Sequence, residues 1–287
     1  MVKGVLLALL AALSWGSSMV MSKSILAEID AGALFFYQIV AATLLSWIVL
    51  IKTHKHFSVN KRSLLAYSTG VFEPFLAYIL TLYGLKSVPA GIASIIFSME
   101  SVFILILSVF ILKMKIKSPG VFVFILVGAM AGSLMVVMPN ISHENGGLTG
   151  YLLVLVGVMS ASFYVVISSK LVDSFEPIEL LTGQLTFSLI LAVPFILISG
   201  GGTSLSVETG VLITLSGMLQ YFLAFFLYLH ALRWIQVYIA GVILYFIPLI
   251  AILLSWLFLK ESISPMQFAG IILTVSSVYI LNKKYGH

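Results

Sequence analysis

The chain contains ten apolar stretches, each long enough to cross a lipid bilayer. A spanning α-helix needs about 20 mostly apolar residues, because each residue advances the helix by about 1.5 Å and the hydrocarbon core is about 30 Å thick. The segments between the stretches are short and leave no room for a soluble domain. The ten predicted spans are 4–24, 32–51, 63–85, 91–112, 119–138, 148–169, 178–199, 209–230, 236–259 and 265–282.

The composition excludes the other large classes of protein. Hydrophobic residues make up 61% of the chain and charged residues 9%, against roughly 45–50% and 25% in a soluble domain. So few charges cannot cover a surface that faces water, and a disordered chain would need low hydrophobicity and high charge. The absence of cysteine excludes a disulfide framework and a thiolate metal site. The predicted fold class is therefore an all-α integral membrane protein.

The basic residues predict how the chain is oriented in the membrane. With the N-terminus in the cytoplasm, twelve of the 15 Lys and Arg residues fall on the inner side and three on the outer side. Cytoplasmic loops of membrane proteins carry such an excess. We therefore predict a multi-pass protein of the cell (inner) membrane with both termini in the cytoplasm. The inner residues are Lys3, Lys52, Lys55, Lys61, Arg62, Lys113, Lys115, Lys117, Lys170, Arg233, Lys283 and Lys284.

The second half of the chain repeats the polar positions of the first. Each half has five predicted spans, an odd number, so the second half crosses the membrane in the opposite direction. Inverted repeats are typical of secondary transporters, which bind substrate near the midplane between the repeats. We predict a first repeat at 1–142 and an inverted second repeat at 143–287, together forming one unit. Matching pairs, at offsets of 146 or 147 residues, are Gly4 and Gly150, Ser14 and Ser160, Ser22 and Ser168, Gln38 and Gln184, Gly70 and Gly217, and Glu73 and Gln220.

Two of the ten acidic residues lie deep inside predicted spans. Glu73 is roughly 15 Å from the inner surface and Glu100 roughly 13–14 Å from the outer surface, so both reach the middle of the bilayer. No Lys or Arg shares that depth. Such carboxyl groups usually face a cavity and have a function, although a protonated glutamate can also bond two helices structurally. Glu100 is our first candidate, and Glu73 our second, for coupling protons or binding a cation.

Aromatic side chains are predicted at the same depth as the two carboxyl groups. Trp15 lies too deep for the aromatic belt at the membrane surface. Aromatic faces beside carboxylates suit an ammonium group, while packing is the alternative for any single ring. Phe225 and Tyr228 belong to the same level. The predicted substrate-binding residues are Trp15, Glu73, Tyr78, Glu100, Gln220, Tyr221 and Tyr245.

Several predicted spans contain serines spaced along one helical face, and two prolines lie near the middle of their spans. Ser14, Ser18 and Ser22 share one helical face, which favours close helix packing, with a cavity wall as the alternative. Pro74 and Pro248 lack a backbone donor, so we predict kinks at these two positions. Carbonyl groups freed by a kink can find new partners inside a bundle.

Four short segments in three of the spans are distinctive. The first span contains LSWGSS at 13–18, the fourth MESVF at 99–103, and the ninth PLI at 248–250 and LFLKE at 257–261. These segments resemble the drug/metabolite transporter superfamily, specifically its EamA-type members, with Ser101 and Lys260 replacing an expected Pro and Gly. The resemblance implies ten helices in two inverted five-helix repeats. It also implies secondary transport, often export, of amino acids, amines, nucleobase-type metabolites or toxic compounds.

We predict a secondary transporter, not an enzyme, that exports a small amino acid or amine-like metabolite by alternating access, either coupled to protons or facilitative. The open alternatives are a carrier of a quaternary ammonium compound such as choline, or of nucleobase or drug-like compounds. The sequence has no nucleotide-binding loop and no metal-ligand pattern, so we expect no cofactor. The expected partners are a small-molecule substrate, the lipid bilayer and protons, with no nucleic acid, and the expected state is a monomer or weak dimer.

Overall fold

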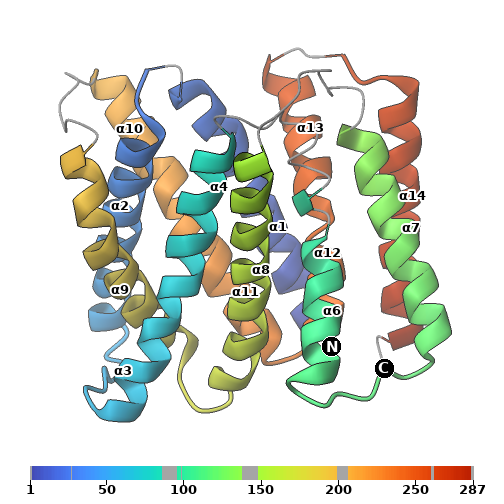
Figure 1. The fold of residues 1–287 in the computed structure, drawn as a ribbon, viewed down its shortest axis with the longest axis horizontal. Helices are drawn as coiled ribbons and strands as arrows, with labels where there is room; N and C mark the ends of the chain where they lie inside the picture. The colour runs from blue at the N-terminus through green and yellow to red at the C-terminus, as the bar shows by residue number, and fades with distance from the viewer. Residues whose placement is uncertain are drawn as a thin grey trace.

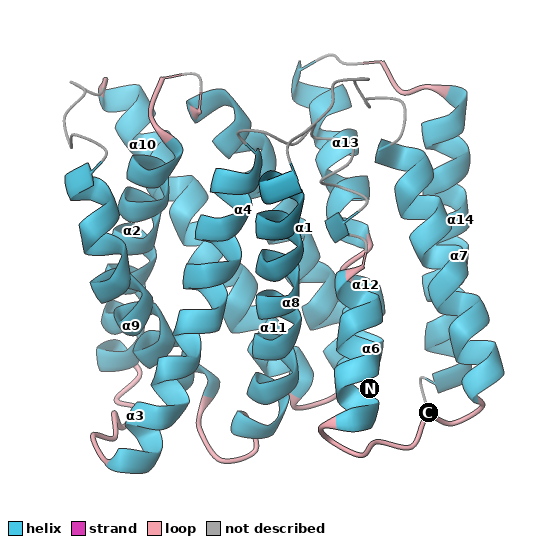
Figure 2. Cartoon of the chain, viewed as in Figure 1, coloured by secondary structure: helices cyan, strands magenta, loops and turns pink. Residues whose placement is uncertain are grey.

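The computed structural model describes residues 2–26, 28–85, 96–97, 99–137, 148–198, 206–259 and 262–285. These residues form helices and loops without any β-strand (Figure 2). The helices are α1 (Val2–Ile25), α2 (Ala31–Lys52), α3 (Lys61–Tyr67), η1 (Ser68–Val71), η2 (Phe72–Leu76), α4 (Ala77–Leu85), α6 (Glu100–Phe110), α7 (Pro119–Val137), α8 (Leu148–Leu171), α9 (Pro177–Ile198), α10 (Val207–Gly217), η4 (Met218–Leu223), α11 (Ala224–Leu232), α12 (Val237–Ile243), α13 (Phe246–Leu259) and α14 (Pro265–Tyr285).

The predicted all-α membrane fold is confirmed. Within the described part of the chain, nine helical segments are long and apolar enough to cross a membrane, and α6 is a shorter apolar helix. Part of the predicted fourth span, at 91–95 and 98, lies outside the described residues, as does the predicted repeat boundary after residue 142. Pro119 and Pro265 begin helices, as predicted, because the first turn of a helix needs no donor from the proline nitrogen.

The helices run alternately up and down, and both termini lie at the same end of the bundle (Figure 1). We call this end the terminal end. The loops at 53–60, 111–118, 172–176 and 233–236 lie there too. The twelve basic residues predicted on one side of the membrane therefore share one end of the molecule.

The two halves of the bundle make matching contacts. α4 packs on α8 as α1 packs on α11, while α1 and α8 run in opposite directions (Figure 1). Gln38 Nε2 donates to Ser216 Oγ at 2.8 Å, and the matching Gln184 Nε2 donates to Thr69 Oγ1 at 2.8 Å. Equivalent residues thus form equivalent hydrogen bonds across antiparallel helices, in agreement with the predicted inverted repeat.

Three spans in the described part of the chain are interrupted near their middle. The third and eighth spans contain the π-helical turns η2 and η4. Glu73 in η2 has φ −150° and ψ 132°, outside the helical range. In the fourth span the described helix α6 begins at Glu100, and its 11 residues cover about 16 Å, half of a bilayer core. The ninth span breaks between α12 and α13, at Leu244 and Tyr245.

The predicted kinks at Pro74 and Pro248 are confirmed at two of these interruptions. Pro248 has no N–H for the carbonyl of Leu244, four residues earlier, and its ring crowds that carbonyl. The backbone around Leu244 and Tyr245 instead forms bonds to the third preceding residue, Leu244 N to Gly241 O at 3.2 Å and Tyr245 N to Val242 O at 3.3 Å. Proline chemistry thus explains the break in the ninth span.

Candidate functional site at the interrupted helices

The interruptions carry most of the residues predicted to bind substrate. Glu73 lies in η2, and Gln220 and Tyr221 lie in η4. Glu100 is the first residue of α6, and Tyr245 lies at the break between α12 and α13. Substrate sites of secondary transporters are typically formed by such discontinuous helices near the midplane. The remaining two predicted residues, Trp15 and Tyr78, come from α1 and α4, which border η4 and η2.

Serine side chains from neighbouring helices donate hydrogen bonds to backbone carbonyl groups at or next to the interruptions. Ser160 Oγ donates to Phe72 O and the matching Ser14 Oγ donates to Leu219 O, both at 2.8 Å. Ser188 Oγ donates at 2.8 Å to Gly70 O, the carbonyl that Pro74 leaves without a helical donor. Ser101 Oγ donates at 2.6 Å to Gly241 O near the end of α12. These serines therefore have a structural role: they hold the broken helices in place.

Two carboxyl groups occupy the middle of this arrangement. Glu73 is buried, Glu100 is half-buried, and the two are close enough to interact electrostatically. Neither carboxyl group forms a hydrogen bond or an ion pair with a described residue. Carboxyl groups that share a poorly solvated site in this way attract a proton or another cation.

One group of aromatic rings lies on the α2, α4 and η4 side of the carboxyl groups. The ring centroids of Tyr78 and Tyr221 are 4.9 Å apart, and those of Phe35 and Tyr221 are 5.7 Å apart. Tyr78 interacts electrostatically with both carboxyl groups, and Tyr221 interacts with Glu73. Both tyrosines therefore lie within electrostatic range of at least one carboxyl group of the pair.

Gln220 is already engaged by its protein neighbours. Its Oε1 accepts a hydrogen bond from Ser18 Oγ at 2.9 Å, and its Nε2 donates to the Tyr221 hydroxyl at 3.4 Å. Gln220 therefore orients Ser18 and Tyr221. The predicted site residue Tyr245 lies near Glu100, with which it interacts electrostatically.

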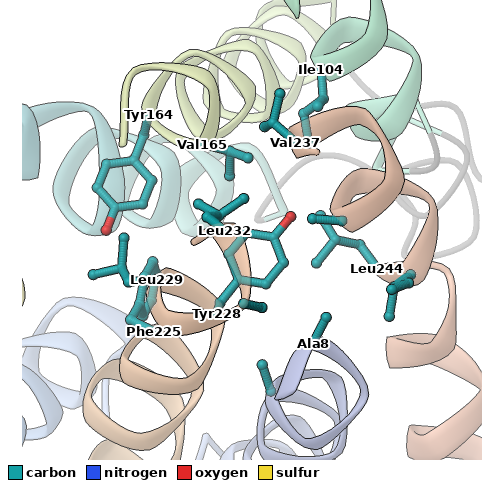
Figure 3. Packing of buried hydrophobic residues seen from close by; sticks show 14 of the residues in the cluster. Ala8, Ile104, Tyr164, Val165, Phe225, Tyr228, Leu229, Leu232, Val237 and Leu244 are labelled. Carbon is teal, nitrogen blue, oxygen red and sulfur yellow. The ribbon is translucent and has the colours of Figure 1, made fainter. Parts of the chain in front are cut away.

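A second aromatic group lies on the α1 and α11 side. The Trp15 ring contacts Phe225 and Tyr228 at centroid distances of 5.2 and 5.4 Å, both edge to face. Tyr228 interacts electrostatically with Glu100 and Glu73, so this group also borders the carboxyl pair. Figure 3 shows Tyr228 among residues of several helices, with Phe225 and Leu229 beside it on α11.

Tyr228 belongs to this second aromatic group near the carboxyl pair, although it was not among the residues predicted to bind substrate. Sequence reasoning placed it at the right depth but selected Tyr221 from the same span. The spacing of seven residues between Tyr221 and Tyr228, about two helical turns, puts both on one helical face and was the available signal. Within the described chain, no group of three or more His, Cys, Asp or Glu residues could hold a metal ion.

Known proteins resemble the chain over nearly its whole length. The model of the EamA-like transporter family matches residues 2–138 and 148–283. An uncharacterized transporter of Archaeoglobus fulgidus is 26% identical over 223 residues, which are 76% of this chain and 77% of that protein. The uncharacterized transporter YetK of Bacillus subtilis is 25% identical over 220 residues, 74% of this chain and 64% of that protein. One solved crystal structure has a TM-score of 0.82 at 16% identity, over 96% of this chain and 97% of that one, and so has the same fold.

Proposed function

The chain belongs to the EamA-like transporter family, and from this premise we propose a secondary-active carrier of a small amine-bearing metabolite, either an amino acid or a related amine. The observation that carries the proposal is the pair Glu73 and Glu100. The two carboxyls share the interrupted middle of the bundle with aromatic rings, and no basic residue in the described chain pairs with them. An ammonium group fits such a site through its charge and through cation–π attraction.

In this proposal, proton transport and substrate transport are coupled because a proton and the substrate's ammonium group compete for the carboxyl pair. A proton and an ammonium group neutralise the same carboxylate, so binding of one displaces the other. If the carrier changes access only when the carboxyl is neutralised, each substrate crosses in exchange for a proton. Under an inward proton gradient this exchange exports the amine, and the interrupted helices are the elements able to move.

The test uses purified full-length protein in sealed liposomes with radiolabelled amino acids and amines. With an acidic lumen, outward proton flow should drive saturable uptake of at least one of these compounds. A protonophore should abolish the gradient-driven part, and protein-free liposomes control for leakage. If no amino acid or amine is taken up, with or without a gradient, the proposal is wrong.

A carrier of a quaternary ammonium compound is the second candidate. It is favoured by the aromatic groups on two sides of the carboxyl pair, one containing Tyr78 and Tyr221 and the other Trp15 and Tyr228, because such rings bind a cation that has no N–H to donate. Adding choline to the liposome assay distinguishes a carrier of primary amines and amino acids from a carrier of quaternary ammonium compounds. Strong transport of choline combined with none of primary amines would favour the second candidate.

A further inference from the structure

Two buried hydrogen-bonding groups in the Trp15, Phe225 and Tyr228 group have no hydrogen-bond partner among the residues that the structure describes. The Trp15 Nε1 and the Tyr228 hydroxyl are both inaccessible to solvent and unbonded. The large majority of buried side-chain polar atoms in proteins are hydrogen-bonded, so each exception needs an explanation. The indole nitrogen can only donate, and a tyrosine hydroxyl can donate as well as accept. The two groups therefore offer two open donors.

Other polar groups near Trp15 and Tyr228 do form hydrogen bonds, which sets the two unbonded donors apart. Tyr164, which contacts Phe225 at a centroid distance of 5.7 Å, donates from its hydroxyl to Gln184 Oε1 at 2.9 Å. Ser18, on the same helix as Trp15, donates to Gln220. The bundle thus satisfies polar groups close to the site and leaves two donors open on rings that touch each other.

The position of Tyr228 connects the open donors with the carboxyl pair. Tyr228 is 1% exposed, and it interacts electrostatically with both Glu100 and Glu73. In Figure 3 its ring projects from α11 into the space between the helices, whereas the hydroxyl of Tyr164 points the other way. The Tyr228 hydroxyl is therefore a buried donor within electrostatic range of both carboxyl groups.

We propose that the Trp15 N–H and the Tyr228 O–H together bind an oxygen acceptor of the substrate. The substrate class is then an amine that also carries a carboxylate or carbonyl oxygen, as an amino acid or its amide does. The ammonium group binds at Glu73 and Glu100, and the oxygen takes the two open donors. A simple amine leaves both donors buried and unpaired, and sites built to bond a polar group strongly reject analogues that lack it. This inference rests on the proposed function and narrows its substrate.

The test compares three matched probes that differ only in the oxygen group. Phenylalanine, phenylalaninamide and phenethylamine form one set, and leucine, leucinamide and 3-methylbutylamine form a second. Binding to the purified full-length protein is measured by isothermal titration calorimetry. We expect the acid or the amide of at least one set to bind about tenfold or more tightly than its amine, the effect of a charge-assisted hydrogen bond.

The informative variant is Tyr228→Phe, which removes one donor and keeps the ring. It should weaken binding of the acid and amide about tenfold and leave binding of the amine within about twofold. Since no hydrogen bond is lost in the free protein, its melting temperature without ligand should not fall. Tyr285→Phe is the matched control: its hydroxyl donates to Ser118 O at 3.0 Å, remote from the site. This control should lower the melting temperature and keep the selectivity.

The outcomes separate this inference from the proposed function. Equal binding of acid, amide and amine by the wild type would overturn the donor pair and leave an amine carrier standing. Equal weakening of all three probes in Tyr228→Phe would do the same, because a merely structural tyrosine gives that pattern. Failure of every probe to bind the wild type would refute the amine carrier itself, and the donor pair with it.

Discussion

Glu73 and Glu100 differ in whether a neutral amide is found at the equivalent position of the other repeat. The partner of Glu73 in the second repeat is Gln220, a neutral amide that accepts a hydrogen bond from Ser18. The same scaffold therefore works with an uncharged group at that position. Glu100 interacts electrostatically with Tyr228 and Tyr245, and it lies in the segment that resembles a family motif. We infer that the Glu100 carboxyl group takes up and releases the coupled proton. Glu73 instead lines the binding site.

Replacing each carboxyl by its amide tests this ranking. Glu100→Gln keeps the shape of the side chain and removes the group that titrates. We expect normal insertion, since an amide is easier to bury than a charge, and a loss of about a hundredfold in gradient-driven transport. Glu73→Gln should keep a substantial part of the activity. Both variants are measured in liposomes with a pH gradient, and full activity in Glu100→Gln contradicts the assignment.

The single elements of this fold depend on hydrogen bonds from helices distant in the sequence. Ser160 of α8 donates to Phe72 O in η2, a carbonyl that also accepts the backbone N–H of Ala77, so removing the hydroxyl breaks the hydrogen bond between the two helices. Ser160→Ala should lower the free energy of unfolding by about 1 kcal/mol, as measured by chemical denaturation in bicelles. Ser17→Ala is the control, because Ser17 Oγ bonds only to Leu13 O within its own helix. A Ser17→Ala loss as large as that of Ser160→Ala would contradict this role of Ser160.

Close approach of helices at the interruptions requires glycine. A Cβ on Gly217 would lie 2.6 Å from the Cα atom of Gln38 in α2, and a Cβ on the matching Gly70 would meet the backbone of Gln184. Because backbone atoms cannot move aside locally, Gly217→Ala should cost about 1–3 kcal/mol of stability.

The matched control for Gly217→Ala lies on the same helix. Gly210 of α10 has open space where a Cβ would be, so Gly210→Ala should be neutral or slightly stabilising. Thermal unfolding of the two variants side by side measures the difference. Equal melting temperatures would mean that α10 and α2 separate at no cost, contrary to the packing described.

The whole molecule has one end rich in basic residues, which predicts a fixed orientation in the membrane. The chain contains no cysteine, so a single introduced cysteine can be labelled without background. His56 and Lys117 are exposed at the terminal end, and Val207 is exposed at the opposite end. A membrane-impermeant maleimide added to intact cells should label Val207→Cys only. Labelling of His56→Cys and Lys117→Cys should require disrupted cells, and the reverse pattern would invert the topology.

The sequence by itself determined the fold class, the spans and the inverted repeat. Apolar length is a local property, and each span can be read from about 20 consecutive residues. The repeat is visible because polar positions such as Gln38 and Gln184 recur at a fixed offset. The depth of Glu73 and Glu100 followed from the same counting, and proline chemistry located two of the three interruptions.

Only the tertiary structure decided how these residues are used. The π-helical turn η4 contains no proline to announce it, and the partners of its polar groups come from the other end of the chain, as Ser14 and Ser18 show. Whether a buried donor is bonded depends on neighbours brought together by packing. In the assembled bundle Gln220 accepts a hydrogen bond from Ser18, whereas the hydroxyl of Tyr228 has no hydrogen-bond partner among the described residues. Hydrogen-bond satisfaction belongs to the assembled bundle, so the pattern along a single helix cannot reveal it.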